Sequence, residues 1–342
     1  TGHRILSEST VRTVGQRVGT ELAALRDKPP SRLSKRLVPG SPEEPPRLAV
    51  VECDGGRMRT RQPNQGRGVL EPHWRETKNA CLLRMTSKTF EEDPHPELPG
   101  CLADRKHVAK LAEAAAPQES DEPRSRCSDS STPATSEPES SQRATREWPP
   151  ERLVRTCLSS LASSSEFGLQ MRREATNRRF DEAPVRAFLG DGLAWNWTIH
   201  KKYFSNYTAI LDFLHAVVYL FLAAKALLAE DEEQVWERYH HWAKLCWSGE
   251  VVRVLTDLRS ALEELDLWGE DLDEKHPHRP LLDAHRYLTN NRSRMDYVTY
   301  RKKGLPVTTA LMESMVKEMN WRVKGTEMFW EDGDGGEAIL QI

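Results

Sequence analysis

The chain has 342 residues, of which 38% are hydrophobic and 30% charged, and its formal net charge is −3. That length is enough for one large domain or two ordinary ones with a buried core. Six cysteines occur without any C-x-x-C pair, which disfavours a zinc ribbon and a disulfide framework, and no signal peptide is visible, so we expect a cytoplasmic protein.

The charge is unevenly distributed along the chain. Residues 1–70 are rich in arginine, residues 230–274 are strongly acidic, and residues 286–324 are basic. This asymmetry favours a polyanionic partner, although a run of charges is usually only a solvated face. Because the chain opens on Thr1, we expect a fragment or a truncated reading frame.

The N-terminal part predicts one helix and two strands. Residues 7–26 have an amphipathic pattern opened by serine and threonine caps, and the basic, proline-rich residues 27–46 are typical of a linker. Residues 47–61 and 74–86 alternate like paired strands.

The middle of the chain predicts disorder and then a helix. Residues 114–149 are mostly Ser, Pro, Glu, Arg and Thr, so they bury too little apolar surface to offset the entropy of ordering. The apolar spacing over residues 151–180 predicts a helix with a serine break.

Beyond residue 180 we expect strand, helix and strand up to residue 215, helices over 216–268, and a further helix over 308–322. The apolar stretch 209–229 contains Asp212, His215 and Lys225, so it fits a buried strand that leads into a buried helix better than a membrane span.

Two aspartates follow apolar runs and precede glycines. Asp54 ends the run at 48–53, and Asp191 ends the run at 185–190. An Asp-Gly pair often does no more than shape a turn. A turn does not require a preceding apolar run, however, and ligands bind where buried strands end. We therefore regard both carboxylates as candidate metal ligands.

A third acidic position is Asp212, followed three residues later by His215. The pair is either part of a metal site or a helix cap with a packed histidine, and we favour a structural or supporting role because one Asp and one His make an incomplete zinc set.

Glu313 lies among apolar residues of the expected 308–322 helix, where a carboxylate should be paired or bind metal. Lys317, one turn on, is the ordinary partner. Basic residues nearby fit contacts with phosphate: Lys302, Lys303, Arg322 and Lys324.

Together, Asp54, Asp191 and Glu313 suggest a carboxylate cluster for phosphoryl transfer. Two hard cations held by three carboxylates stabilise the attacking and leaving oxygens of an in-line displacement. Magnesium prefers oxygen ligands, so we expect two Mg²⁺ ions, for which Mn²⁺ can substitute.

Several passages occur in the order found in one family. They are VECDGGRM at 51–58, HWRETKNAC at 73–81, AFLGDG at 187–192, ILDFLHA at 210–216, GLP at 304–306 with ES at 313–314, RVKGTE at 322–327, FW at 329–330 and EAIL at 337–340. Through these passages the chain resembles the DDE transposases of bacterial insertion sequences. The resemblance covers about two-thirds of the chain.

The resemblance implies an α/β fold with an RNase H-like mixed five-stranded sheet flanked by helices, a helical insertion and a disordered segment. Asp54 would sit on the first strand, Asp191 would end the fourth, and Asp212 and His215 would follow the fifth. The implied regions are a remnant of a helix-turn-helix with its linker at 1–46, core at 47–113, a disordered insertion at 114–149, core at 150–228, a helical insertion at 229–300, and the catalytic helix region with the C-terminus at 301–342.

The resemblance further implies catalysis and metal binding by Asp54, Asp191 and Glu313, with Asp212 and His215 in support. If the first strand is misplaced, Asp212 replaces Asp54 in the triad. The expected contacts with DNA come from Arg75, Lys78, Arg301, Lys302, Lys303, Lys317, Arg322 and Lys324.

The resemblance implies a transposase that cleaves and transfers DNA strands at element ends, as a homo-oligomer on DNA in the nucleoid and without a membrane. The alternatives are a truncated, catalytically inactive remnant that at most binds DNA, and a helical scaffold unrelated to nucleic acid.

Overall fold

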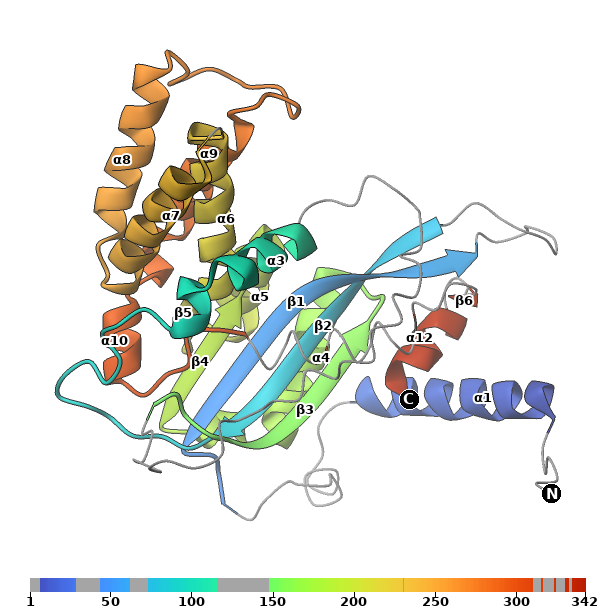
Figure 1. The fold of residues 1–342 in the computed structure, drawn as a ribbon. Helices are drawn as coiled ribbons and strands as arrows, with labels where there is room; N and C mark the ends of the chain where they lie inside the picture. The colour runs from blue at the N-terminus through green and yellow to red at the C-terminus, as the bar shows by residue number, and fades with distance from the viewer. Residues whose placement is uncertain are drawn as a thin grey trace, which may run out of the picture.

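The computed structural model describes residues 7–28, 44–61, 73–115, 148–229, 231–309, 315, 323, 330–331 and 334–342. Its centre is a sheet in the order β3-β2-β1-β4-β5 (Figure 1). The strands are β1 (Leu48–Arg61), β2 (His73–Met85), β3 (Arg152–Ser160), β4 (Val185–Gly190) and β5 (Thr208–Leu211).

The sheet is mixed. β2 pairs antiparallel with both β1 and β3, whereas β4 pairs parallel with β1 and with β5. The two-residue strand β6 (Trp330–Glu331) pairs with the far end of β1. The structure thus confirms an α/β fold with a mixed five-stranded sheet flanked by helices, and it is consistent with an RNase H-like fold.

The start of β1 shows why this sheet lies at the centre. Residues 48–51 are apolar and fully buried, without the alternation of a half-exposed strand. A strand covered on both faces needs apolar side chains on both. Val51 packs with helices α4 (Ser164–Asn177) and α5 (Ala194–Tyr203), while Val50 packs on the opposite face with α6 (Phe213–Leu227) and α3 (Arg105–Ala115).

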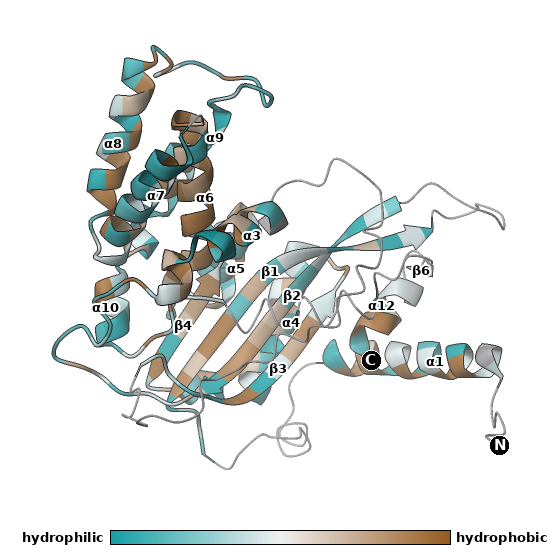
Figure 2. Ribbon diagram, in the orientation of Figure 1, coloured by the Kyte–Doolittle hydropathy of each residue, from teal (hydrophilic) through white to brown (hydrophobic). Residues whose placement is uncertain are grey.

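A helical part stands beside one edge of the sheet (Figures 1 and 2). It contains α6 and α7 (Glu232–Trp247), α8 (Val251–Glu264) and α9 (Arg279–Asn291), whose apolar sides share one core with the sheet. α10 (Tyr297–Lys302) then returns the chain to β5, where the Tyr297 hydroxyl donates to the Leu211 carbonyl at 3.2 Å. The short 3-10 turns are η1 (Gly100–Ala103), η2 (Phe180–Glu182) and η3 (Arg292–Arg294).

The prediction of helices over residues 216–268 is confirmed by α6, α7 and α8. The first helix begins earlier, at Phe213, and turns separate α6, α7 and α8. Gly249, with φ +81°, lies in the turn between α7 and α8. The expected strand and buried helix within residues 209–229 are confirmed as β5 and α6, and no described helix is long and apolar enough to cross a membrane.

The prediction of a helix over residues 151–180 was wrong in its first half. Residues 152–160 form β3, and α4 begins only after Ser163, whose side chain and that of Glu166 form a capping box. The first half of β3 is largely exposed along the edge of the sheet, so its apolar side chains do not alternate. Their irregular spacing therefore imitated a helical pattern.

The boundaries expected for the disordered segment 114–149 also need correction. α3 continues to Ala115, so the first two residues of the segment are helical. At the other end Trp148 is buried, and its Nε1 donates to the Leu305 carbonyl at 3.0 Å. Residues 116–147, on which the prediction of disorder mainly falls, lie outside the described residues.

The expected helix at 7–26 is confirmed as α1 (Glu8–Arg26), which packs against the C-terminal helix α12 (Asp334–Gln341) (Figure 1). The crossing is close, since a Cβ on Gly19 would lie 2.1 Å from the Ala338 carbonyl oxygen. Arg26 also pairs with Glu337 at 2.6 Å. The assignment of α1 to a helix-turn-helix stays a prediction.

Candidate metal centre

Asp54 and Asp191 are brought together by the parallel pairing of β1 and β4. The paired register ends at Cys53 opposite Gly190, so Asp54 and Asp191 are the next residue on each side. Asp191 follows the carboxyl end of β4, whereas β1 continues to Arg61 and carries Asp54 at the level where β4 ends. One carboxylate oxygen from each aspartate and one ring nitrogen of His215 all lie within 4.8 Å of one another.

The Asp191 carboxylate is held by the loop and helix that follow it. Its Oδ1 accepts hydrogen bonds from the backbone N–H of Leu193 at 2.9 Å and from the side-chain amide of Asn196 on α5. The backbone carbonyl of Asp191 accepts from the Tyr287 hydroxyl on α9 at 2.6 Å. The loop can approach Tyr287 because residue 192 is glycine, with φ +97°, and a Cβ there would lie 2.5 Å from the Tyr287 ring.

Asp212 is the N-cap of α6 and is fully buried. Its Oδ1 accepts from the backbone N–H groups of Leu214 at 3.2 Å and Thr309 at 3.0 Å. Its Oδ2 accepts from the Thr309 hydroxyl at 2.7 Å and from Nδ1 of His215 at 2.6 Å. A carboxylate oxygen has two lone pairs, so these four bonds use the capacity of both oxygens.

The hydrogen bond to Asp212 determines which ring nitrogen of His215 faces the carboxylate cluster. Because Nδ1 is bonded to Asp212, Nε2 is the ring nitrogen that remains for the cluster with Asp54 and Asp191. Asp212 therefore orients the imidazole, and it has no lone pair left for an ion unless one of its hydrogen bonds breaks.

The electrostatics of the cluster favour a bound cation. Burial, together with the charge of Asp191, raises the pKa of Asp54 to about 7 against the opposing charge of His215. Burial also raises the pKa of Asp191. Burial would lower the pKa of His215, but its hydrogen bond to Asp212 and the carboxylate charges outweigh this and raise the pKa to about 9. Two partly buried carboxylates that share one space are costly to ionise without positive charge between them.

The third predicted ligand, Glu313, lies outside the described residues, as do Lys317, Arg322 and Lys324. A nearby residue is described: Met315 is helical and buried, and the Sγ of Cys81 on β2 lies 3.4 Å from its Sδ. Cys81 pairs with Glu52, two residues before Asp54.

The prediction that Arg301 contacts DNA was wrong, because its side chain is fully buried. Its Nε donates to Asp93 at 2.8 Å, its Nη2 donates to the Trp247 carbonyl at 3.0 Å, and its guanidinium lies 4.0 Å from the centre of the Trp247 ring. Arg301 is thus a structural cation that ties α10 to the segment after β2.

Lys302 and Lys303 lie at the end of α10, beside the segment that follows β2. The Lys302 carbonyl accepts from Phe90 N–H at 2.8 Å, and Phe90 follows the end of β2 that pairs with the first residue of β1. Asp54 lies six residues further along β1. Lys303 is exposed and Lys302 is half-buried, and the expectation that these lysines hold phosphate stays a prediction.

Lys78 and Arg75 lie nearer to the carboxylates, on β2. Lys78 pairs with Gly55 in the sheet register, its ammonium lies 3.0 Å from the Glu76 carboxylate, and it lies 5.9 Å from the centre of the Trp195 ring. Arg75 donates to the Leu161 carbonyl at 3.4 Å. Both side chains have protein partners, and their contact with DNA stays a prediction.

Three residues around the cluster were missed by sequence reasoning: Asn196, Tyr287 and Thr309. Asn196 carried a signal in the sequence, because an amide that lies between two tryptophans is expected to be buried and then needs a hydrogen-bond partner. Tyr287 and Thr309 carried none, since their contacts with the site depend on how distant segments pack.

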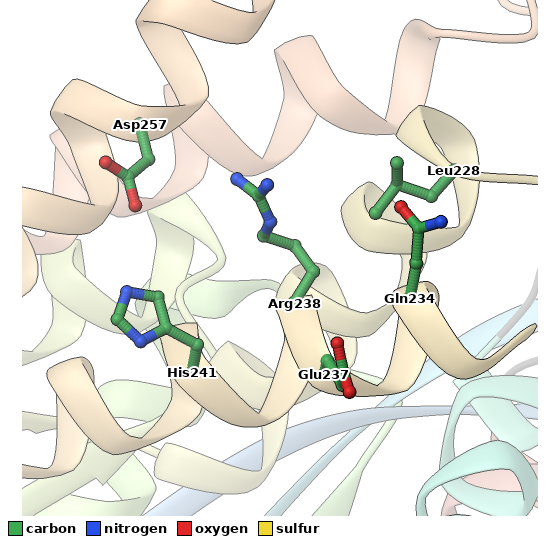
Figure 3. Close-up of a pocket in the computed structure, with 6 residues that line it drawn as sticks. All are labelled: Leu228, Gln234, Glu237, Arg238, His241 and Asp257. Carbon is green, nitrogen blue, oxygen red and sulfur yellow. The ribbon is translucent and has the colours of Figure 1, made fainter. Parts of the chain in front are cut away.

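A separate pocket of about 380 Å³ lies in the helical part (Figure 3). Arg238 and His241 of α7 point toward Asp257 of α8 across it. Asp257 accepts from Nε1 of Trp242 at 3.1 Å. None of the carboxylates of the candidate metal centre lines this pocket, so the pocket is separate from that centre.

Comparisons with family models, with curated proteins and with solved structures found no match to this chain.

Proposed function

We propose that this chain is the catalytic core of a DDE-type transposase, an enzyme that cleaves and transfers DNA strands at the ends of an insertion sequence. The observation that carries the proposal is the convergence of Asp54 and Asp191, 137 residues apart in the sequence, at the point where β4 ends beside the middle of β1. A mixed five-stranded sheet with Asp54 on its first strand and Asp191 at the end of its fourth is what the resemblance of the sequence motifs implies.

The residues present fit a divalent metal. Two carboxylates with raised pKa values supply the oxygen ligands that Mg²⁺ and Mn²⁺ prefer, and Glu313 is the third ligand in the proposal. Once bound, two such ions would stabilise the attacking and leaving oxygens of an in-line displacement at phosphorus.

The protein contributes position and charge. Asn196, Leu193 and Gly192 hold the Asp191 carboxylate and its loop, and Asp212 orients His215. A protonated His215 would neutralise the carboxylate pair before metal binds, and its Nε2–H could then donate to a phosphate oxygen of the DNA.

The proposed partner is DNA, both the element ends and the target, bound by a homo-oligomer of this chain. The proposed location is the cytoplasm, in association with the nucleoid. Among the described basic residues, Lys78 lies on β2 directly opposite Gly55, but its side chain is buried and paired with Glu76, so a contact with the DNA backbone requires it to leave that pair.

The test is a nicking assay on supercoiled plasmid with the purified chain in Mg²⁺, in Mn²⁺ and in EDTA. The proposal predicts nicked product that requires metal. DNA binding without nicking in either metal would instead identify an inactive remnant, and the absence of DNA affinity at low salt would remove nucleic acid from the account.

A further inference from the structure

Asn196 is fully buried in the first turns of α5, directly behind the candidate metal centre. Its side chain joins the two strands that carry the carboxylates. Nδ2 donates to Oδ1 of Asp191, which follows β4, and Oδ1 accepts from the Cys53 thiol on β1 at 3.3 Å. Cys53 is the residue immediately before Asp54.

These two contacts fix which way the amide faces. A carboxylate only accepts hydrogen bonds, so the –NH₂ group must face Asp191, and the amide oxygen then faces the thiol. A half-turn of the amide would set its oxygen against the carboxylate and leave the –NH₂ group only the weakly accepting thiol sulfur. The amide is therefore locked between the two strands.

The fold leaves room for this amide by placing glycine at the end of β4. A Cβ on Gly190 would lie 3.0 Å from Nδ2 and 3.2 Å from Cβ of Asn196. A larger residue at 190 would push α5 away from the strand. The close approach of Asn196 to the carboxylate thus depends on a specific small residue in the strand itself.

The lock determines which oxygen of Asp191 is presented to a ligand. Oδ1 already accepts from both Leu193 N–H and Asn196. Oδ2 is the oxygen left to face Asp54 and a cation. Partners that orient a ligating group commonly change metal affinity by about 10- to 100-fold when they are removed.

We infer that Asn196 is a positioning residue for the metal centre, which holds the Asp191 carboxylate in the rotamer that binds the divalent cation. This inference rests on the proposed function for the identity of the ligand, a divalent cation. A purely structural Asn196 would satisfy buried polar atoms and affect stability alone.

The experiment measures the binding of Mn²⁺ to the purified full chain by electron paramagnetic resonance, with thermal unfolding recorded for every variant. Asn196→Ala should weaken the affinity for Mn²⁺ about 10-fold or more. The matched control is Gln170→Ala, which removes another buried amide, from α4, without touching the carboxylates. That control should leave the affinity within about twofold of wild type even if its Tm falls equally, given the 10- to 100-fold effects expected of orienting partners.

A second pair of variants keeps the test decisive if Asn196→Ala fails to fold. Cys53→Ala removes the second contact that anchors the amide, which is then held by Asp191 alone, and should weaken Mn²⁺ binding, whereas Cys53→Ser keeps a donor and should restore it. Wild-type affinity in Asn196→Ala or in Cys53→Ala would overturn the positioning role. Failure of the wild-type chain to bind Mn²⁺ at all would overturn the metal centre itself, and the inference with it.

Discussion

Nδ1 of His215 lies 2.6 Å from Oδ2 of Asp212, three residues earlier, at the point where β5 passes into α6. The bond links the cap of a buried helix to the carboxylate cluster, because the same His215 ring lies within reach of Asp54 and Asp191. Asp212 thus caps α6, and the histidine that it holds contributes its imidazole to the carboxylate cluster.

Asp212→Asn should destabilise the protein more than it changes the metal site. Asparagine cannot accept at both positions, so hydrogen bonds from His215 and Thr309 would be lost in a buried place. We expect a loss of about 2–4 kcal/mol in the free energy of unfolding, measured by urea denaturation without metal. Thr309→Val, which removes one of these bonds, should cost about 1 kcal/mol. Equal stability of Asp212→Asn and wild type would contradict the assigned role.

The raised pKa of Asp54 predicts how stability depends on pH. The pKa is 3.8 for an ordinary aspartate and about 7 in the folded protein, so the folded state holds this proton more tightly. Its contribution to stability is fully present below about pH 4 and is lost as the pH rises through 7. Asp54→Asn lacks this titration, so at pH 7.5 without metal we expect it to be more stable than wild type by roughly 1–2 kcal/mol, a value discounted for partial exposure.

Asp93→Asn is the control of opposite sign. Although burial opposes it, the hydrogen bond from Arg301 lowers the pKa of Asp93, so its contribution is present above about pH 4 and lost as the pH falls. This variant should be less stable than wild type at pH 7.5. A destabilised Asp54→Asn under the same conditions would show that the carboxylate pair carries no electrostatic cost.

Tyr287 connects the helical part to the candidate metal centre. Its hydroxyl bonds to the Asp191 carbonyl at 2.6 Å, and its ring stacks on Tyr219 of α6 with ring centres 3.9 Å apart. Tyr287→Phe keeps the ring and removes the bond, so we expect a loss of about 1 kcal/mol in stability and weaker affinity for Mn²⁺. Tyr203→Phe, which removes a hydroxyl bonded to the Ser165 carbonyl, should leave metal binding unchanged. Unaltered Mn²⁺ affinity in Tyr287→Phe would mean that the helical part does not act on the Asp191 loop.

The sequence predicted the fold best where the hydrophobic pattern of one segment determines its own secondary structure and burial. Mainly apolar runs before Asp54 and Asp191 predicted two buried strands, and β1 and β4 confirm those strands, although β1 continues beyond Asp54 to Arg61. Edge strand β3 was missed because its exposed half carries no alternation. The basic residues misled the DNA-contact predictions because charge alone does not reveal burial, and Arg301 illustrates this.

The hydrogen bonds that hold Asp212 and Asp191 from distant segments could not be predicted from the sequence. Thr309 reaches Asp212 across 97 residues, and Tyr287 reaches Asp191 across 96. Such contacts depend on how the helical part packs against the sheet, and no periodic pattern in either segment specifies that packing.

The central claim is that Asp191 holds a metal ion that acts on DNA. The most direct measurement compares wild type and Asp191→Asn for nicking of supercoiled plasmid in Mn²⁺ and, on the same folded samples, for DNA affinity. We expect Asp191→Asn to lose nicking by about 100-fold or more, because one ligand to the ion is gone. Its DNA affinity should equal that of wild type or be slightly higher, since a negative charge near phosphate is removed. Nicking by Asp191→Asn at the wild-type rate would contradict the account.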